Sequence, residues 1–366
     1  MDRLQSISVK GFKSIRDQSI DLSPITVLVG PNAAGRSNFV SLFKMLGFMV
    51  TGSFQEFIGR SGGADSLLHY GAKRTPQIEV ELEYQADSVT DRYKMRVVHV
   101  PKDTLMFAEE YVEYHRDTYP QPHRVDLKPG THETGLIEKA KESDTAAVIL
   151  GILRRCGWYQ FHDTSSEAKI RNKGYIGDNS YLRSDAGNLA AFLYMLQEAH
   201  AEDYRLIIQT LRRVAPPFHD FYLEPDRLDS SSIMLRWRGK DSDYLFGPHQ
   251  LSDGFLRFAA LTTLFLQPSR YRQPLIVIDE PELGLHPAAI SILASMCYSV
   301  SHESQIILAT QSVTLVNEFD VESIIVVEHD GKETALSRPD PANLEAWLRD
   351  YSLGEIWEKN VIGGRP

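Results

Sequence analysis

Residues 30–37 read Gly30-Pro31-Asn32-Ala33-Ala34-Gly35-Arg36-Ser37. This stretch decides the fold, because it matches the phosphate-binding loop pattern at every fixed position except Arg36. Residues 25–29 form an apolar run, which predicts a strand buried on both faces. Residues 37–48 carry apolar side chains at helical spacing. A strand, a glycine-bearing loop and a helix in this order predict an anion site at the helix N-terminus.

The residue types of this loop suit a nucleotide. Glycine lets the backbone wrap a phosphate without Cβ clashes, and the exposed N–H groups bind the anion. We expect every residue from Gly30 to Asn38 to contact the nucleotide and the Ser37 hydroxyl to ligate Mg²⁺. Arg36 stands where the pattern has lysine, and its longer planar fork would place charge less well in the transition state. Taken alone, a glycine-rich turn with no ligand is the alternative.

A second apolar run, residues 275–278, ends in two acids, Asp279 and Glu280. An unpaired buried carboxylate is costly, and Mg²⁺ would remove that cost. We expect Asp279 to hold the ion, directly or through water, and Glu280 to be the general base that polarises the attacking water. The alternative is a solvent-exposed strand end, which is common for one acid and less so for two.

A third segment, Leu251-Ser252-Asp253-Gly254, opens another predicted helix. Ser252 is a good N-cap candidate, so this helix N-terminus is a second anion site. The segment alone is weak evidence, because a capping serine beside a glycine is common. In this order with the other two segments it becomes strong.

The rest of the chain alternates strand and helix patterns, which imply parallel crossover units. Residues 77–115 instead read as an antiparallel meander with one wet face, and residues 138–156 and 188–214 read as helices. The predicted fold is an α/β P-loop core with a mixed or parallel sheet, an antiparallel β subdomain and an inserted helical lobe. The expected segments are an N-terminal core part, 1–76, an insertion, 77–215, and a C-terminal core part, 216–366.

Composition narrows the class of protein. The chain has 366 residues, of which 42% are hydrophobic, and a net charge of −10. This charge argues against a surface coated evenly for nucleic acid, although a local basic groove around Lys169, Arg171, Lys173 and Arg183 stays open. No stretch is long and apolar enough to predict a membrane helix, and no signal peptide is evident. Only two cysteines occur, far apart, so we expect a cytoplasmic protein without a membrane partner.

The combined motifs resemble the RecF/SMC-like branch of the ABC ATPases, close to the bacterial AAA_21 ATPases and to OLD nuclease ATPase heads. The likeness covers residues 1–72 and 216–330, and includes Val9-Lys10-Gly11-Phe12-Lys13-Ser14 and a D-loop position at residues 282–287. It implies an ABC-type ATPase head that pairs head to head around two ATP molecules, in a homodimer or a higher oligomer. The P-loop of one head would then face Ser252 and Gly254 of the other.

The resemblance also assigns roles to residues outside these motifs. Lys13 would lie near the adenine or ribose. Gln311 takes the place of the switch histidine, and it can hydrogen-bond the γ-phosphate but cannot titrate. The usual Q-loop glutamine is not evident, with Gln77 and His69 as stand-ins that are more often ordinary residues. Arg36 and Gln311 together predict slow ATP turnover.

Three functions fit these expectations. The first is a slow ATPase that serves bacterial DNA maintenance or anti-phage defence as a motor or sensor, with a separate effector protein because only 55 residues follow Gln311. The second is a scaffold that binds ATP without hydrolysis. The third is a DNA clamp that uses the basic set named above. The pair His162-Asp163 is set aside as a structural hydrogen bond or cap, because no nucleophile is apparent near it.

Overall fold

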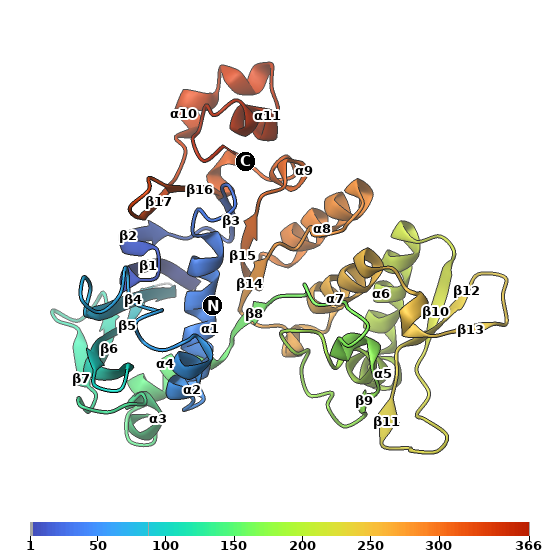
Figure 1. The fold of residues 1–366 in the computed structure, drawn as a ribbon, viewed down its shortest axis with the longest axis horizontal. Helices are drawn as coiled ribbons and strands as arrows, with labels where there is room; N and C mark the ends of the chain where they lie inside the picture. Colours follow the sequence, from blue (N-terminus) through green and yellow to red (C-terminus); the bar gives the residue numbers. More distant parts are fainter. Residues whose placement is uncertain (1–2, 87, 366) are drawn as a thin grey trace. The chain divides into compact units, whose positions relative to one another are not determined.

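The computed structural model describes residues 3–86 and 88–365, and the chain divides into two compact units (Figure 1). Unit 1 comprises Met1–Trp158, Pro274–Val277 and Gln305–Pro366. Unit 2 comprises Tyr159–Gln273 and Ile278–Ser304. Each unit therefore draws on segments that are far apart in the sequence.

One six-stranded sheet of unit 1 is antiparallel throughout. Its strands alternate buried apolar and half-buried polar residues, which is the period-two pattern of a sheet with one wet face. On the wet face Arg92 bridges Glu81, Glu83 and Glu113. In spatial order the strands are β2 (Ile15–Asp21), β1 (Arg3–Phe12), β4 (Gln77–Ala86), β5 (Val89–Val100), β6 (Thr104–Arg116) and β7 (His123–Asp126).

The second six-stranded sheet carries the P-loop strand β3, which pairs in parallel with both β15 and β16. Strands β3, β14 and β15 are buried at every residue, which explains their continuous apolar runs. Strands β14 and β8 begin in unit 1 and end in unit 2. In spatial order the strands are β17 (Thr334–Ser337), β16 (Ile324–His329), β3 (Ile25–Val29), β15 (Gln305–Thr310), β14 (Leu275–Asp279) and β8 (Cys156–Tyr159).

One cluster of buried apolar side chains joins the two sheets of unit 1 with helices α1, α2 and α4. Helix α1 buries Phe39, Leu42, Phe43 and Leu46 in this core, which confirms the helical spacing read from the sequence. The helices of unit 1 are α1 (Arg36–Val50), α2 (Phe54–Arg60), α3 (Leu136–Lys139), α4 (Asp144–Arg154), α9 (Val313–Val316), α10 (Pro341–Leu344) and α11 (Leu353–Glu358).

Unit 2 is a helical lobe with small antiparallel sheets. Helix α7 packs between α6 and α8, and α5 packs on α6. The helices are α5 (Leu189–Ala199), α6 (Ala201–Val214), α7 (Asp253–Leu266) and α8 (Pro287–Val300). The strands are β9 (Gly174–Tyr175) paired with β11 (Ser232–Ile233), and a three-stranded sheet of β10 (Phe218–Tyr222), β12 (Arg236–Gly239) and β13 (Leu245–Phe246).

Two long helices read from the sequence are broken in the structure. The segment 138–156 holds the end of α3, then α4, and it ends where β8 begins at Cys156. The segment 188–214 is interrupted at His200, whose φ of −141° and ψ of 52° are not helical. His200 donates its N–H to Leu196 O at the end of α5 and accepts from Tyr204 N at the start of α6. One residue thus ends one helix and begins the next.

The bounds of the two units differ from those of the three segments predicted from the sequence. The meander β4–β6 continues the sheet of β1 and β2, because β4 pairs along the free side of β1. It therefore lies in unit 1, and the lobe begins at Tyr159. Among the described residues, no helix is long and apolar enough to cross a membrane.

Candidate nucleotide site

The P-loop joins β3 to α1 with a backbone shaped for an anion. Ala33 and Gly35 both have positive φ, +66° and +113°. Successive residues of alternating hand turn backbone N–H groups toward one side and form an anion-binding concavity. The Ser37 side chain is exposed in the first turn of α1, where the helix dipole favours negative charge. The loop therefore has the geometry and the donor types that a phosphate and its magnesium ion require.

The two glycines of the loop are packed without space for a side chain. A Cβ on Gly30 would lie 2.2 Å from the Val327 carbonyl oxygen. A Cβ on Gly35 would lie 2.1 Å from the Thr334 hydroxyl oxygen. Both distances are far below any real contact, so glycine is required at both positions by packing as well as by conformation.

Arg36, the departure from the lysine pattern, is buried, with 5% of its surface exposed. One of its guanidinium nitrogens lies 3.5 Å from the Asn32 side-chain oxygen, across the loop. A guanidinium is longer and wider than an ammonium group, so it fills this space differently from the lysine of the pattern.

Lys13, expected near the nucleotide, lies beside α1. Its Nζ donates to the Ser41 hydroxyl at 2.8 Å, one helical turn after Ser37. Burial, with a smaller contribution from Lys44, lowers the pKa of Lys13. Its backbone has a φ of +50°, an uncommon value for lysine that turns the chain sharply between β1 and β2.

The two acids at the end of β14 differ in environment. Asp279 is 5% exposed, at the last residue of the buried strand. Glu280 has a φ of +47°, a strained value for a residue with a Cβ, and its side chain is 23% exposed. Asp279 is therefore the more buried of the two acids and Glu280 the more accessible.

His162 lies next to these acids. The sequence did not predict this contact. Its Nε2 is 3.0 Å from the Asp279 carbonyl oxygen and 3.9 Å from a Glu280 carboxylate oxygen. Because a carbonyl can only accept, Nε2 carries the proton and donates it to Asp279. The sequence held no signal for this contact, because His162 and Asp279 are 117 positions apart.

The structure also offers a better Q-loop candidate than those considered from sequence. Gln160 directly follows β8, the strand beside β14, and its amide nitrogen lies 3.2 Å from His162 Nδ1. Gln77 instead donates to Glu79 at 2.7 Å on β4. His69 is buried and its Nδ1 contacts the Lys13 carbonyl oxygen at 2.9 Å. Both earlier stand-ins therefore have structural roles.

The segment of residues 251–254 begins α7 as expected. The Ser252 hydroxyl caps the helix and accepts from Phe255 N at 3.2 Å. A Cβ on Gly254 would lie 2.2 Å from the Gly284 carbonyl oxygen, so the first turn of α7 packs backbone to backbone against the D-loop position. A cavity of about 270 Å³ opens here, lined by Ser252, Gly254, Gly284 and His286 among others.

Two arginines make hydrogen bonds around residues 251–254. Arg171, 6% exposed, donates to the Leu251 carbonyl oxygen at 3.1 Å and to Asp253 at 2.6 Å. Its hydrogen bond lowers the pKa of Asp253. Arg257 donates to the backbone oxygens of His162 at 2.9 Å and Leu283 at 3.3 Å. Helix α7, His162 and the D-loop position are thus held together within unit 2.

The switch position, Gln311, follows β15 and is half-buried. Strand β15 lies between β3, which leads into the P-loop, and β14, which leads into the acids. Ser312 after it caps α9 by accepting from Leu315 N at 3.2 Å. A neutral amide at this position can accept or donate a hydrogen bond but cannot exchange a proton.

The basic residues considered for DNA are paired within the chain. Lys173 lies 2.5 Å from Asp226, Arg183 lies 2.9 Å from Asp178, and Lys169 lies 3.7 Å from Asp185. Arg171 is the buried residue described above. The hydrogen bond from Lys173 lowers the pKa of Asp226 to about 2. Each of these basic side chains thus has an acidic partner within the chain.

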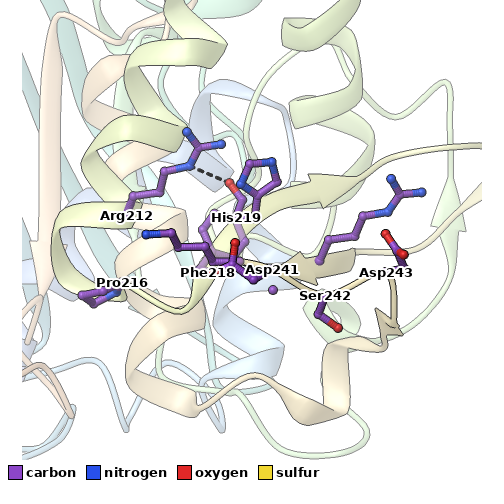
Figure 2. A pocket seen from close by; sticks show the side chains of 10 residues that line it. Arg212, Pro216, Phe218, His219, Asp241, Ser242 and Asp243 are labelled. Atoms are coloured by element: carbon purple, nitrogen blue, oxygen red, sulfur yellow. Dashed lines mark hydrogen bonds between the residues drawn. The ribbon is translucent and has the colours of Figure 1, made fainter.

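Unit 2 has a further cavity, of about 780 Å³, which contains none of the predicted site residues (Figure 2). Arg212 lies at its wall and donates to the His219 carbonyl oxygen at 2.6 Å. Asp241 and Asp243 line it together with Arg238 and Lys240, so opposite charges share the opening. This mixture of charges does not select a ligand class.

Ser37 offers a hydroxyl oxygen and Asp279 a carboxylate oxygen. Hard oxygen ligands of this kind, completed by phosphate oxygens and water, suit Mg²⁺. Within the described part of the chain no group of three or more His, Cys, Asp or Glu residues has the arrangement of a metal site.

Two family models match parts of the chain. The AAA_23 model, an AAA domain, matches residues 6–185. The AAA_21 model, described as "AAA domain, putative AbiEii toxin, Type IV TA system", matches residues 158–317. Among curated proteins, the Old nuclease of Escherichia phage P2 is 22% identical over 394 residues. That alignment covers 96% of this chain and 63% of the nuclease, so the chain spans less than two thirds of that relative.

Three solved structures share the fold. An Smc head bound to the C-winged helix domain of ScpA has a TM-score of 0.59 at 17% identity, covering 94% of this chain and 99% of that one. The SMC head domain from Thermotoga maritima has 0.50 at 14%, covering 92% and 99%. The Pyrococcus furiosus Smc head with an extended coiled coil, bound to the C-terminal domain of ScpA, has 0.59 at 14%, covering 96% and 99%. The chain therefore has the α/β P-loop fold of the SMC heads, and two parts of it match AAA domain models.

Proposed function

We propose that this chain binds Mg²⁺–ATP, pairs head to head with a second copy around the nucleotide, and hydrolyses it slowly. The observation that carries the proposal is the P-loop backbone, with Ala33 and Gly35 at positive φ and Ser37 exposed at the start of α1. A backbone concavity at the N-terminus of a 15-residue helix supports the binding of an anion there.

The roles of the residues follow their chemistry. The loop from Gly30 to Asn38 binds the triphosphate, with Lys13 beside α1 as a further contact. Ser37 and Asp279 hold Mg²⁺, which neutralises charge that develops on the phosphates. Glu280 accepts a proton from the attacking water, and Gln311 hydrogen-bonds the γ-phosphate. Support comes from the sheet, in which β3 and β14 both neighbour β15.

We expect slow ATP hydrolysis because of the residues at two positions, Arg36 and Gln311. Arg36 is buried and reaches toward Asn32, so its charge is less freely placed than that of an exposed lysine. Gln311 cannot take up or release a proton. Such a head stays closed on ATP for longer than one with a lysine and a histidine, which is the behaviour of an ATP sensor.

The second copy completes the site. In the proposed pair, Ser252 and Gly254 at the start of α7 present a helix N-terminus to the nucleotide on the other copy. The cavity at this helix start, next to Gly284 and His286, supports the proposal, because it leaves room for a ligand. ATP then favours the closed pair, and hydrolysis releases it.

For the biological role we propose anti-phage defence or DNA maintenance with a separate effector protein. The support is the likeness to the Old nuclease over 96% of this chain. The AAA_21 description, which names a toxin and a type IV toxin–antitoxin system, points to the same class of process. A pull-down from a bacterial host with the ATP-locked Glu280→Gln variant as bait would recover the effector, and recovery of no specific partner would count against it.

Mass photometry tests the pairing. With ATP and Mg²⁺ we expect the mass of one chain, 41.4 kDa, to double, and the Glu280→Gln variant to stay doubled for longer because it cannot hydrolyse the nucleotide. Ser252→Arg, which places a bulky cation at the helix start, is the matched control that should remain single. Calorimetry that detects no ATP uptake by folded wild type would overturn the whole proposal.

The alternative of a scaffold that binds ATP without hydrolysis is favoured by the same two positions, Arg36 and Gln311. Phosphate release distinguishes the two functions. A slow ATPase releases phosphate at a rate that Glu280→Gln lowers by about 100-fold or more, as expected for a general base. Equal release by wild type and variant would favour the scaffold.

A further inference from the structure

The hairpin of β16 and β17 lies directly against the P-loop. The Val327 carbonyl oxygen of β16 fills the space where a side chain of Gly30 would stand, and Thr334 of β17 does the same at Gly35. Thr334 is fully buried, and its N–H donates to the Ser14 carbonyl oxygen at 2.8 Å. A buried threonine at a phosphate loop is a polar group in a place that apolar side chains normally fill.

The Thr334 hydroxyl takes part in a chain of hydrogen bonds. It lies 2.7 Å from the Ala34 carbonyl oxygen and 2.8 Å from the Ser14 hydroxyl, which in turn lies 2.7 Å from the Asn38 amide nitrogen. A carbonyl only accepts, and a hydroxyl has one proton, so Thr334 donates to Ala34 and accepts from Ser14. Ser14 then accepts from Asn38. These hydrogen bonds tie the loop to the first turn of α1.

The position of the Ala34 carbonyl has a consequence for the loop. In a planar trans peptide the C=O and the following N–H point in opposite directions. Because Thr334 holds the Ala34 carbonyl on the hairpin side, the Gly35 N–H points away from the hairpin. Alternative rotations of this peptide are open to glycine, which tolerates either sign of φ, so the hydrogen bond selects one of them.

We propose that Thr334 is a positioning residue for the nucleotide, which fixes the Ala34–Gly35 peptide so that the Gly35 N–H is ready for a phosphate oxygen. The inference rests on the proposed function of the loop. It assigns to a residue 300 positions away in the sequence a part of the affinity for ATP. Preorganised donors bind an anion more tightly, because they do not have to be ordered when the anion binds.

Calorimetric titration with ATP and Mg²⁺ tests this role in two variants. Thr334→Val keeps the shape and removes the hydroxyl, and we expect the Kd for ATP to rise about tenfold, which is about 1.4 kcal/mol. Thr334→Ser keeps the hydroxyl and should restore the Kd to within about twofold of wild type. Thr262→Val is the matched control, since Thr262 is fully buried and its hydroxyl has no partner within residues 3–86 and 88–365.

The outcomes separate this inference from the proposed function. If wild type takes up no ATP, the proposed function fails. If wild type binds ATP and folded Thr334→Val binds it equally well, even with a lowered unfolding midpoint, Thr334 has only a structural role and the inference fails. Should Thr334→Val not fold, Ser14→Ala removes the donor to Thr334, and a Kd raised about threefold is expected. An unchanged Kd in Ser14→Ala would then overturn the inference.

Discussion

Arg36 is the single residue at which the P-loop departs from its pattern, and its replacement tests whether it slows the reaction. In Arg36→Lys we expect the ATPase rate at saturating ATP to rise about tenfold, because a compact ammonium group concentrates charge on the transferred phosphate. Arg36→Gln, which has no charge, is the control and should weaken ATP binding. Steady-state phosphate release measures both. A rate in Arg36→Lys no higher than that of wild type would mean that Arg36 is not the brake.

Glu110 is a buried acid outside the site, and it makes stability depend on pH. It accepts hydrogen bonds from Tyr93 at 2.7 Å, from the Thr134 hydroxyl and from Gly135 N at 2.8 Å. Burial raises its pKa in spite of these bonds. A carboxyl whose folded pKa is raised gives stability below its unfolded pKa of about 4.3, and this stability is lost as pH rises through the folded pKa.

Urea unfolding at several pH values tests this pH dependence. It compares the unfolding free energy of wild type with that of Glu110→Gln. The difference in unfolding free energy between the two should fall as pH rises from about 4.3 through the folded pKa, because only wild type titrates there. Glu113→Gln, on the same strand, makes the same carboxyl-to-amide change outside the buried network of Glu110 and is the matched variant. A difference that rises with pH would contradict the raised pKa of Glu110.

The residues of the site differ in how far the sequence could predict them. Ser37, Asp279 and Ser252 each lie in a short contiguous motif, so local residue order is enough to propose them. The contacts of His162 with Asp279 and of Thr334 with Ala34 join residues 117 and 300 positions apart. No local pattern encodes such pairs, because they arise only when the strands are assembled into a sheet.

At the scale of elements, helix α7 depends on a backbone contact at its first turn. Gly254→Ala would place a Cβ 2.2 Å from the Gly284 carbonyl oxygen, and two backbones cannot both move aside cheaply. We expect it to lower the unfolding free energy by about 1–3 kcal/mol. Gly151→Ala in the middle of α4, where a Cβ meets nothing within 4 Å, should raise it by about 0.5–1 kcal/mol. Thermal unfolding of both variants measures this, and equal effects would contradict the packing argument.

Elements that are buried on all sides or regular in period were predictable, and short ones were not. Strands β3, β14 and β15 are buried along their whole length and mainly apolar, and β4 alternates strictly. Strand β8, Cys156–Tyr159, has only four residues and follows a helix directly, so its apolar side chains read as a continuation of that helix. The break at His200 has no glycine or proline to announce it.

At the scale of the whole molecule, the division into units follows strand pairing rather than chain order. Residues 77–86 look like the start of an insertion because their composition changes there, yet β4 pairs along β1 over seven residue pairs. Sequence reasoning detects a change of pattern but not the partner of a strand. The same limit applies to the pairing of two chains. A surface that contacts a second copy has no recurring sequence pattern by which it could be predicted.

A mixing experiment tests whether the complete site needs two copies. Ser37→Ala removes a magnesium ligand, and Ser252→Arg blocks the start of α7, so each variant alone should be inactive. In a mixed pair, the intact P-loop of one chain faces the intact helix start of the other, which restores one site of two. Because Ser252→Arg does not pair with itself, a mixed pair is the form that holds an intact site, and the mixture should show ATPase activity that neither variant shows alone. The double variant mixed with Ser37→Ala has no intact site and is the control. If the activity of the first mixture stays at that of the control, the heads do not complete each other's sites.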